Sequence, residues 1–254
     1  MKSLQATVHY RRIFTKGQEN VSIYQTAYDM KIDLRREQSE TLNRPHFKYC
    51  LGPRIFFLGM DITAGKKNTL PKAKLLEILA SVPYREWEIR QYCRLTMKYR
   101  NRKKVDWAQE IVGWGRSAQD NEYNHLLVIQ EKMKEDGMKD RWFLSPPVVF
   151  LVVTFYVILS KIIAWTHIKG GFKFNAAFED HAEHVYAKMV EDNPQWENEK
   201  VTTPVAKAYA DVDTWADIFR RISLDERDHR NHSFYYAGMP EHIIKYDGMP
   251  SIVD

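Results

Sequence analysis

The 254-residue chain has only two cysteines, Cys50 and Cys93, which are too few for a disulfide framework and lack the spacing of metal ligands. Their scarcity favours a reducing compartment. The first residues lack the apolar core of a secretory signal. No segment has the two-residue alternation of a strand. The formal charge is +5, but no nucleic-acid-binding motif accompanies the basic residues, so no nucleic-acid partner is expected.

The sequence shows the periodicity of helices in place of the alternation of strands. Apolar residues recur at helical spacing, which predicts helices over 46–62, 70–99, 107–135, 142–167, 172–191, 204–209 and 212–236. Gly170 and Gly171 are expected to separate two of them, and the fold class predicted is all-α. The polar, weakly periodic residues 1–44 predict an N-terminal extension, residues 45–238 a single helical domain, and residues 239–254 an irregular C-terminal tail.

The most apolar segment is residues 142–167. Ser145 and Pro146 are typical of a helix start, and almost no polar group follows until Lys161. Lys161 interrupts the run before it reaches the roughly 18 uncharged residues of a membrane-spanning helix. The sequence leaves open a buried helix, a helix that dips into a membrane, and a true span.

Two Glu-x-x-His motifs carry the chemistry. Glu122 and His125 form one, and Glu226 and His229 form the other, each on an expected helix. Residues three apart lie on one helical face, so each motif presents a carboxylate and an imidazole together. A pair of iron ions in a helical bundle is bound by two such helices and by one Glu from each of two others.

Two further glutamates complete that set. Glu77 lies between Leu76 and Ile78, and Glu179 lies in an Ala-Ala-Phe-Glu segment, each on the expected helix that precedes a motif. A carboxylate among apolar residues is costly to bury unless it is paired or bound to metal. Each residue alone has an ordinary explanation, such as an exposed helix edge or a core histidine. The order of all six on separate helices favours a di-iron site.

With these motifs the chain resembles the alternative oxidase family, and most closely its plastid terminal oxidase branch. The similarity runs from about residue 45 to 235. It is carried by the four segments Leu76–Glu77–Ile78, Asn121–Glu122–Tyr123–Asn124–His125–Leu126, Phe178–Glu179–Asp180–His181–Ala182 and Asp225–Glu226–Arg227–Asp228–His229.

The resemblance implies a ferritin-like four-helix bundle with a di-iron centre and two additional membrane-associating helices. Its metal ligands would be Glu77, Glu122, His125, Glu179, Glu226 and His229. Tyr186 would be the catalytic tyrosine, supplying a proton and an electron during O–O cleavage. Asn121 and Asp225 would orient the ligands.

The implied function is a quinol:oxygen oxidoreductase that reduces dioxygen to water without pumping protons. Its substrate would be ubiquinol or plastoquinol. The implied membrane association is monotopic, through residues 46–62 and 142–167. Its location would be the mitochondrial inner membrane, a thylakoid or other plastid membrane, or a bacterial membrane, as a homodimer or in a larger respiratory assembly.

The sequence departs from the family pattern on the side where quinol is expected. Ile78 and Val185 stand where the family has Thr, and Lys72 is the cation nearest to the position of a frequent Arg. Together with the N-terminal extension and the tail, this leaves open a non-catalytic structural subunit of a membrane respiratory complex. A di-iron hydroxylase that acts on a quinone precursor or a fatty chain also stays open, because the same ligand set would serve it.

Overall fold

The computed structural model describes residues 32–252. Its contacts divide the chain into a unit of Leu34–Ile244 and a second unit of Met1–Asp33 with Lys245–Asp254. The first unit contains every helix discussed below. Of the predicted N-terminal extension, residues 1–31 lie outside the described residues, and Leu34–Asn43 form a helix.

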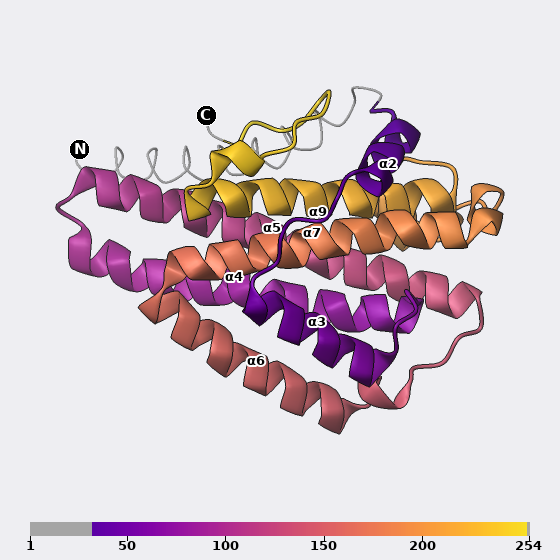
Figure 1. Cartoon of the computed structure of the whole chain (residues 1–254), viewed down its shortest axis with the longest axis horizontal. Helices are drawn as coiled ribbons and strands as arrows, with labels where there is room; N and C mark the ends of the chain where they lie inside the picture. Colours follow the sequence, from indigo (N-terminus) through magenta and orange to yellow (C-terminus); the bar gives the residue numbers. More distant parts are fainter. Residues whose placement is uncertain (1–31, 253–254) are drawn as a thin grey trace, which may run out of the picture. The chain divides into compact units, whose positions relative to one another are not determined.

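The described residues form eight α-helices and no strand (Figure 1). The helices are α2 (Leu34–Asn43), α3 (Leu51–Ala64), α4 (Leu70–Lys98), α5 (Arg102–Glu135), α6 (Pro146–Thr166), α7 (Ile168–Asp192), α8 (Pro204–Tyr209) and α9 (Trp215–Ala237). Three short 3-10 turns, Trp142–Leu144, Pro194–Glu197 and Pro240–His242, lie in the connections and after α9. The predicted all-α class is confirmed.

Capping side chains set where the long helices begin. Thr69 accepts a hydrogen bond from the backbone N–H of Lys72 at the start of α4, and Thr214 caps α9 in the same way. Asn101 caps α5, which therefore begins at Arg102 and not at Trp107 as expected. Gly238 ends α9 in the left-handed conformation, with a φ of 80°.

The prediction that Gly170 and Gly171 separate two helices is wrong, because both lie in the first turn of α7. The break falls at His167, between α6 and α7. Gly171 is needed for packing: a Cβ there would lie 3.2 Å from Ile163 and 3.4 Å from the Trp87 indole. The absent side chain allows α7 to approach α6 and α4 closely.

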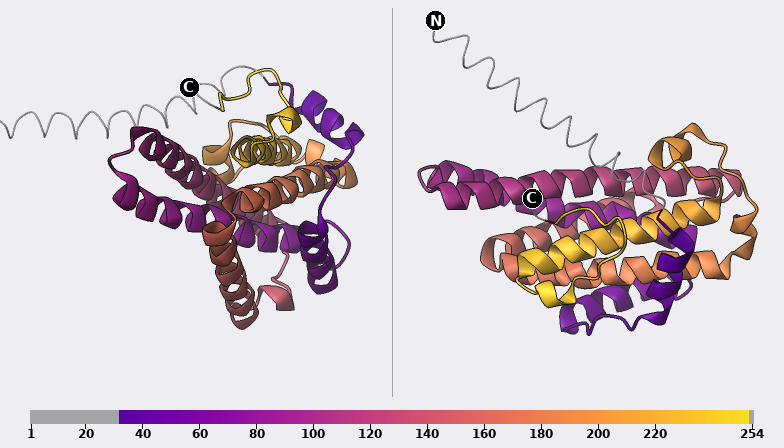
Figure 2. Two further views of the ribbon diagram at one scale, coloured as in Figure 1. Left: turned by 60° about the vertical axis from the view of Figure 1, so that its left-hand side comes forward. Right: turned by 90° about the horizontal axis from the view of Figure 1, so that it is seen from above.

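Four long helices enclose the core. α4 packs along α5, α7 packs along α9, and further contacts join α4 to α7 and α5 to α9. The helices therefore follow one another around the core in the order α4, α5, α9, α7, and Figure 2 shows them from two further directions. Buried apolar clusters lie between them, as expected for amphipathic helices that turn their apolar stripes inward.

Helices α3 and α6 lie along one side of these four helices (Figure 1). They contact each other, for example through the rings of Phe56 and Tyr156, whose centroids are 5.5 Å apart. α6 is the one described helix long and apolar enough to cross a membrane, and only 17% of its most apolar 18-residue window is buried. The described residues of the chain therefore leave most of the apolar surface of α6 uncovered. α3 begins five residues later than the predicted helix, because residues 46–50 are not helical.

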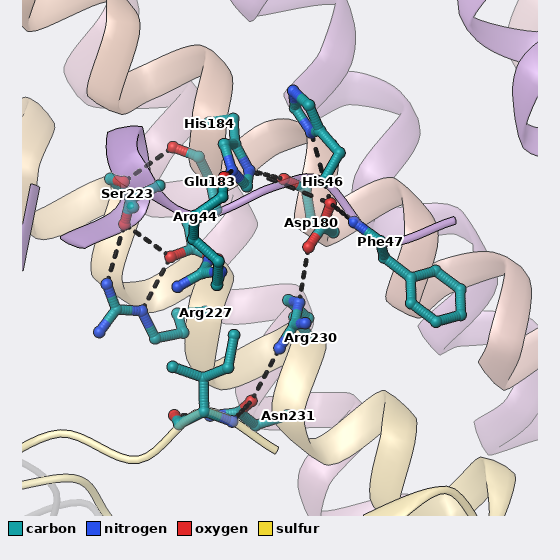
Figure 3. A network of polar contacts seen from close by, with 12 residues as sticks. Arg44, His46, Phe47, Asp180, Glu183, His184, Ser223, Arg227, Arg230 and Asn231 are labelled. Carbon is teal, nitrogen blue, oxygen red and sulfur yellow. Dashed lines mark hydrogen bonds and ion pairs between the residues drawn. The ribbon is translucent and has the colours of Figure 1, made fainter. Parts of the chain in front are cut away.

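Helix α2 is held against α7 and α9 by buried charges (Figure 3). Arg227 on α9 pairs with Glu37 on α2 and with Glu183 on α7, the latter at 2.8 Å. Arg44 and Thr41 also contact the Glu183 carboxylate, at 2.6 and 2.8 Å. α2 therefore packs through polar groups that a hydrophobic pattern does not reveal.

Candidate metal centre

Four helices bring the six predicted ligands together. α4 carries Glu77 and α7 carries Glu179, while α5 carries Glu122 with His125 and α9 carries Glu226 with His229. In each Glu-x-x-His motif the two side chains share a helical face. All six are buried, with at most 7% of any of them exposed.

The six residues form two overlapping groups. Glu77, Glu122, His125 and Glu226 make one, and Glu122, Glu179, Glu226 and His229 make the other. Within each group one potential ligand atom from every residue lies within 4.8 Å of the others, and Glu122 and Glu226 belong to both. The arrangement suits two adjacent cations that share two bridging carboxylates.

The histidine side chains point one ring nitrogen into the centre. The Nδ1 of His125 lies 3.3 Å from Glu77 Oε2 and 3.2 Å from Glu226 Oε1. The Nδ1 of His229 lies 2.8 Å from Glu122 Oε1 and 3.5 Å from Glu226 Oε2. Each imidazole can therefore supply one nitrogen to a cation placed among the carboxylates.

Apart from the contacts that the six residues make with one another, the inward-facing atoms have no hydrogen-bond partner among residues 32–252. They are both carboxylate oxygens of Glu122 and of Glu226, the Oε2 atoms of Glu77 and Glu179, and the Nδ1 atoms of His125 and His229. No lysine or arginine of the described residues pairs with these glutamates, whose recorded ionic partners are the two histidines. Buried polar atoms without partners are rare, and here they converge on one place.

The electrostatics of the centre reflect crowded negative charge. Burial and the neighbouring Glu122 and Glu226 raise the pKa of Glu77 well above its usual value, and the same causes raise the pKa of Glu179. Burial would also raise the pKa of Glu122, but His229 and His125 hold it below its usual range. Burial would lower the pKa of His229, yet Glu122 and Glu226 raise it well above its usual value. The raised pKa values mean that the centre binds protons to reduce its negative charge. Bound cations would displace these protons.

The predicted orienting residues lie where they can act on His125. Asp225 Oδ2 is 3.3 Å from His125 Nε2, the ring nitrogen that faces away from the centre. Asn121 Nδ2 lies 3.3 Å from the same oxygen. Tyr209 on α8, which the sequence did not indicate, donates to that oxygen at 2.6 Å, and Arg221 pairs with the other oxygen of Asp225. These contacts fix the ring so that Nδ1 faces the carboxylates.

Two tyrosines touch the carboxylates of the centre. The predicted Tyr186 donates a hydrogen bond to Glu77 Oε1. Tyr84, which the sequence did not indicate as a site residue, donates to Glu179 Oε1 at 2.7 Å. Asn175, also missed, donates to the same oxygen at 2.8 Å. Asn175 stands one turn before Glu179 on α7, and that spacing is the only sequence signal for it.

The donor set fits a pair of divalent cations. Four carboxylates and two imidazoles provide oxygen-rich surroundings with one nitrogen for each cation, which suits iron and manganese better than metals that prefer thiolates. Two divalent charges would balance four carboxylates, and the inward-facing atoms would gain ligands in place of missing hydrogen bonds.

A third group of potential ligands, His46, Asp180 and His184, does not fit a metal. Asp180 already accepts hydrogen bonds at both oxygens, from Arg230 and from the Phe47 backbone N–H, each at 2.9 Å (Figure 3). The Tyr49 hydroxyl also donates to it, at 2.8 Å. The two ring nitrogens of His184 face the carbonyl oxygens of Asp180 and Arg44. His184 therefore has no ring nitrogen left for a cation, and Asp180 is already neutralised by Arg230.

Comparisons with known proteins, one against family models and one against curated proteins, give no match for this chain.

Proposed function

We propose that this protein is a membrane-associated quinol:oxygen oxidoreductase with a di-iron carboxylate centre in a ferritin-like bundle. The observation that carries the proposal is the convergence of unpartnered carboxylate oxygens and imidazole nitrogens from α4, α5, α7 and α9 on one buried place. The helix order, a Glu helix followed by a Glu-x-x-His helix and then the same again, supports the ferritin-like assignment.

The roles of the carboxylates follow from which oxygens are already bonded. Glu77 and Glu179 each have one oxygen held by a tyrosine, so each offers one oxygen to one cation. Glu122 and Glu226 have both oxygens free of hydrogen bonds among the described residues, and they would bridge the two cations. When bound, the iron pair supplies the redox chemistry that reduces dioxygen. Tyr186 holds its hydroxyl proton against Glu77, at the edge of the centre.

The quinol would enter from the side of α3 and α6. Apolar side chains are exposed there, including Leu51, Ile55, Leu58 and Ile62 on α3 and Phe150, Leu151, Phe155, Ile158 and Ile162 on α6. An exposed apolar face of this kind is typical of a protein that lies on a lipid surface. This supports monotopic membrane association through α3 and α6.

A small pocket lies between that face and the metal centre. Its walls include Phe56, Phe57 and Met60 on α3, Leu76 on α4 and Val185 on α7. Leu76 and Val185 are the chain neighbours of Glu77 and Tyr186, which do not themselves line the pocket. Lys72 and His181 add polar groups at the same place. The pocket has a volume of only about 10 Å³, enough for one water molecule, so its side chains would have to move to admit a quinol ring.

The direct test measures iron content and oxygen uptake on one lipid-supplied sample, with ubiquinol and plastoquinol in turn. We expect about two irons per chain, as in related di-iron bundles, and quinol-dependent uptake. Glu122→Ala removes a ligand common to both groups and should abolish both properties. Glu131→Ala is the matched control, because Glu131 lies on the same helix and pairs with Lys134 at the surface.

The outcomes separate the remaining alternatives. Iron without quinol-dependent uptake would contradict the oxidase and favour the structural subunit, or the hydroxylase if oxygen is retained in an organic product. A wild-type chain that takes up no iron would overturn the proposed catalytic centre.

Membrane association has its own test. Phe150 and Phe155 on α6 are each 69% exposed. The double variant Phe150→Glu/Phe155→Glu should lose flotation with phospholipid vesicles and keep its iron, because charge at these positions opposes burial in lipid. Met97→Glu is the matched control, since Met97 is 72% exposed but lies at the far end of α4. Unchanged flotation of the double variant would contradict docking through α6.

A further inference from the structure

Helices α4 and α7 carry the same pair of residues at the same spacing. Glu77 is followed by Tyr84 on α4, and Glu179 is followed by Tyr186 on α7. In both cases the tyrosine comes two helical turns after the glutamate and therefore lies on the same face. All four side chains are buried, none with more than 1% exposed.

The two pairs are crossed between the helices. Tyr186 on α7 donates to Glu77 Oε1 on α4, and Tyr84 on α4 donates to Glu179 Oε1 on α7 at 2.7 Å. In each glutamate the other oxygen, Oε2, has no hydrogen-bond partner among the described residues. Each phenol thus fixes one oxygen of the opposite carboxylate and leaves one oxygen directed to the centre.

The Tyr84 hydroxyl is itself held in place. Asn175 Nδ2 lies 3.0 Å from the Tyr84 hydroxyl, 2.8 Å from Glu179 Oε1 and 3.1 Å from the Ser233 hydroxyl on α9. The amide therefore links the phenol and the carboxylate to α9, the helix that carries His229. Tyr186 is placed differently, by its ring, which stacks on Phe219 with the centroids 6.2 Å apart.

The Tyr84 ring is locked by aromatic neighbours. Trp87 and Trp114 meet it edge to face, each with a centroid separation of 5.2 Å. Gly115 allows α5 to come close at this point, since a Cβ there would lie 3.3 Å from the Tyr84 carbonyl oxygen. The hydroxyl thus has one available orientation, toward Glu179.

We propose that Tyr84 is a positioning residue for the half of the centre formed by Glu179 and His229, as Tyr186 is for the half formed by Glu77 and His125. The inference rests on the proposed metal centre. Tyr84 and Asn175 both donate to Glu179 Oε1, so Oε2 would be the oxygen with which Glu179 holds a cation. Each phenol thereby sets the affinity of one cation, and the two affinities can be changed separately.

Cobalt(II) is the probe, because its absorption reports binding without any turnover. The full-length, metal-free chain is titrated with Co²⁺ in competition with a chelator. Tyr84→Phe should lower the affinity for one of the two Co²⁺ ions by about 10- to 100-fold, the usual effect of removing a group that orients a ligand. The affinity for the other ion should not change. Tyr186→Phe should lower the affinity for the other ion.

Ligand-deleted backgrounds assign the affected half. In His125→Ala, which disables the half with Glu77, Tyr84→Phe should still weaken the Co²⁺ ion that is left. In His229→Ala, which disables the half with Glu179, Tyr84→Phe should have no further effect. Tyr156→Phe is the matched control, since this buried phenol lies near enough to Glu179 for the carboxylate to raise its pKa but hydrogen-bonds to Ser160 and not to a proposed ligand. Asn175→Ala tests the same half without altering the packed ring.

Each result bears on one hypothesis or both. If the wild type binds two Co²⁺ ions and neither Tyr84→Phe nor Asn175→Ala changes either affinity, the positioning role is overturned and the oxidase proposal stands. If Tyr84→Phe lowers the affinity for both ions equally, the assignment of Tyr84 to the half with Glu179 and His229 is overturned. A wild-type chain that binds no Co²⁺ overturns the positioning role and the metal centre together. Half-specific weakening in a chain without oxidase activity supports the positioning role and counts against the oxidase.

Discussion

Helices α7 and α9 each serve two buried charge clusters that are built in opposite ways. The candidate metal centre includes Glu179 and Glu226, with no lysine or arginine paired to them among the described residues. The network beside α2 takes the adjacent residues Asp180 and Arg227, together with Glu183, and its carboxylates are paired with arginines. One step along a helix turns the side chain by about 100°, so neighbouring residues serve different clusters.

The comparison shows how a structural acid differs from a ligand. Glu183 accepts from Arg44, Arg227 and Thr41, and these contacts satisfy both of its oxygens. Glu226 is equally buried, and neither of its oxygens accepts a hydrogen bond from the described residues. A buried acid that is paired with arginines joins two helices, whereas a group of buried acids that has only two histidines as ionic partners suits the binding of cations from outside the chain.

The largest expected effect comes from breaking the paired cluster. Arg227→Met leaves the carboxylates of Glu37 and Glu183 without their shared guanidinium. We expect the free energy of unfolding of the metal-free chain to fall by about 5 kcal/mol, the upper range for breaking a buried ion pair. Urea unfolding measures this loss. Arg102→Met, at an exposed pair with Asp106, should cost less than about 1 kcal/mol.

Metal binding by the same variant sharpens the comparison. Arg227→Met removes no proposed ligand, so the folded variant should still bind two Co²⁺ ions. If a folded Arg227→Met chain loses both ions, the two clusters act as one unit and the distinction drawn between them is wrong.

A smaller effect is expected from two matched Glu→Gln substitutions. Glu183→Gln removes the charge that faces Arg44 and Arg227, and should cost about 3 kcal/mol in the metal-free chain. Glu77→Gln should change that stability by no more than about 0.5 kcal/mol, because the raised pKa of Glu77 already favours its neutral form. Co²⁺ binding should reverse the order, with Glu77→Gln losing one ion and Glu183→Gln none. Equal losses of stability would contradict the assignment of roles.

The smallest effect is a change in pH dependence. Burial would raise the pKa of Glu183, but Arg227 and Arg44 hold it below its usual value. A depressed pKa means that the ionised carboxylate stabilises the fold above its unfolded pKa of about 4.3 and loses this contribution as the pH falls through its folded value. Urea unfolding between about pH 6 and pH 3 should therefore show a smaller decrease for Glu183→Gln than for the wild type. Parallel curves would contradict this.

Most of the fold was predictable from hydrophobic periodicity, and the exceptions have physical reasons. α2 was not predicted as a helix because the residues that it buries, Glu37 and Thr41, are polar. The start of α5 was missed because its first turn, Arg102–Val105, is mainly charged and begins at the Asn101 cap. Gly171 was misread because a glycine that permits close packing cannot be told from one that ends a helix without knowing its neighbours.

The six proposed ligands could be found because each Glu-x-x-His motif is local in sequence, and the structure brings all six together. Tyr84 and Tyr209 could not be found from the sequence, because their hydrogen bonds reach Glu179 and Asp225 on other helices. Such contacts depend on how helices pair, which spacing along one chain does not encode.

The shared carboxylates have a consequence for how the protein matures. One ligand group takes Glu77, Glu122 and His125 from the chain before α6, yet it also needs Glu226 from α9. Neither group is complete until the ribosome has passed residue 226 and α9 has docked. The cations of the proposed centre would therefore find a complete set of ligands only after α9 has been synthesised and has docked, which is later than the synthesis of α3 and α6.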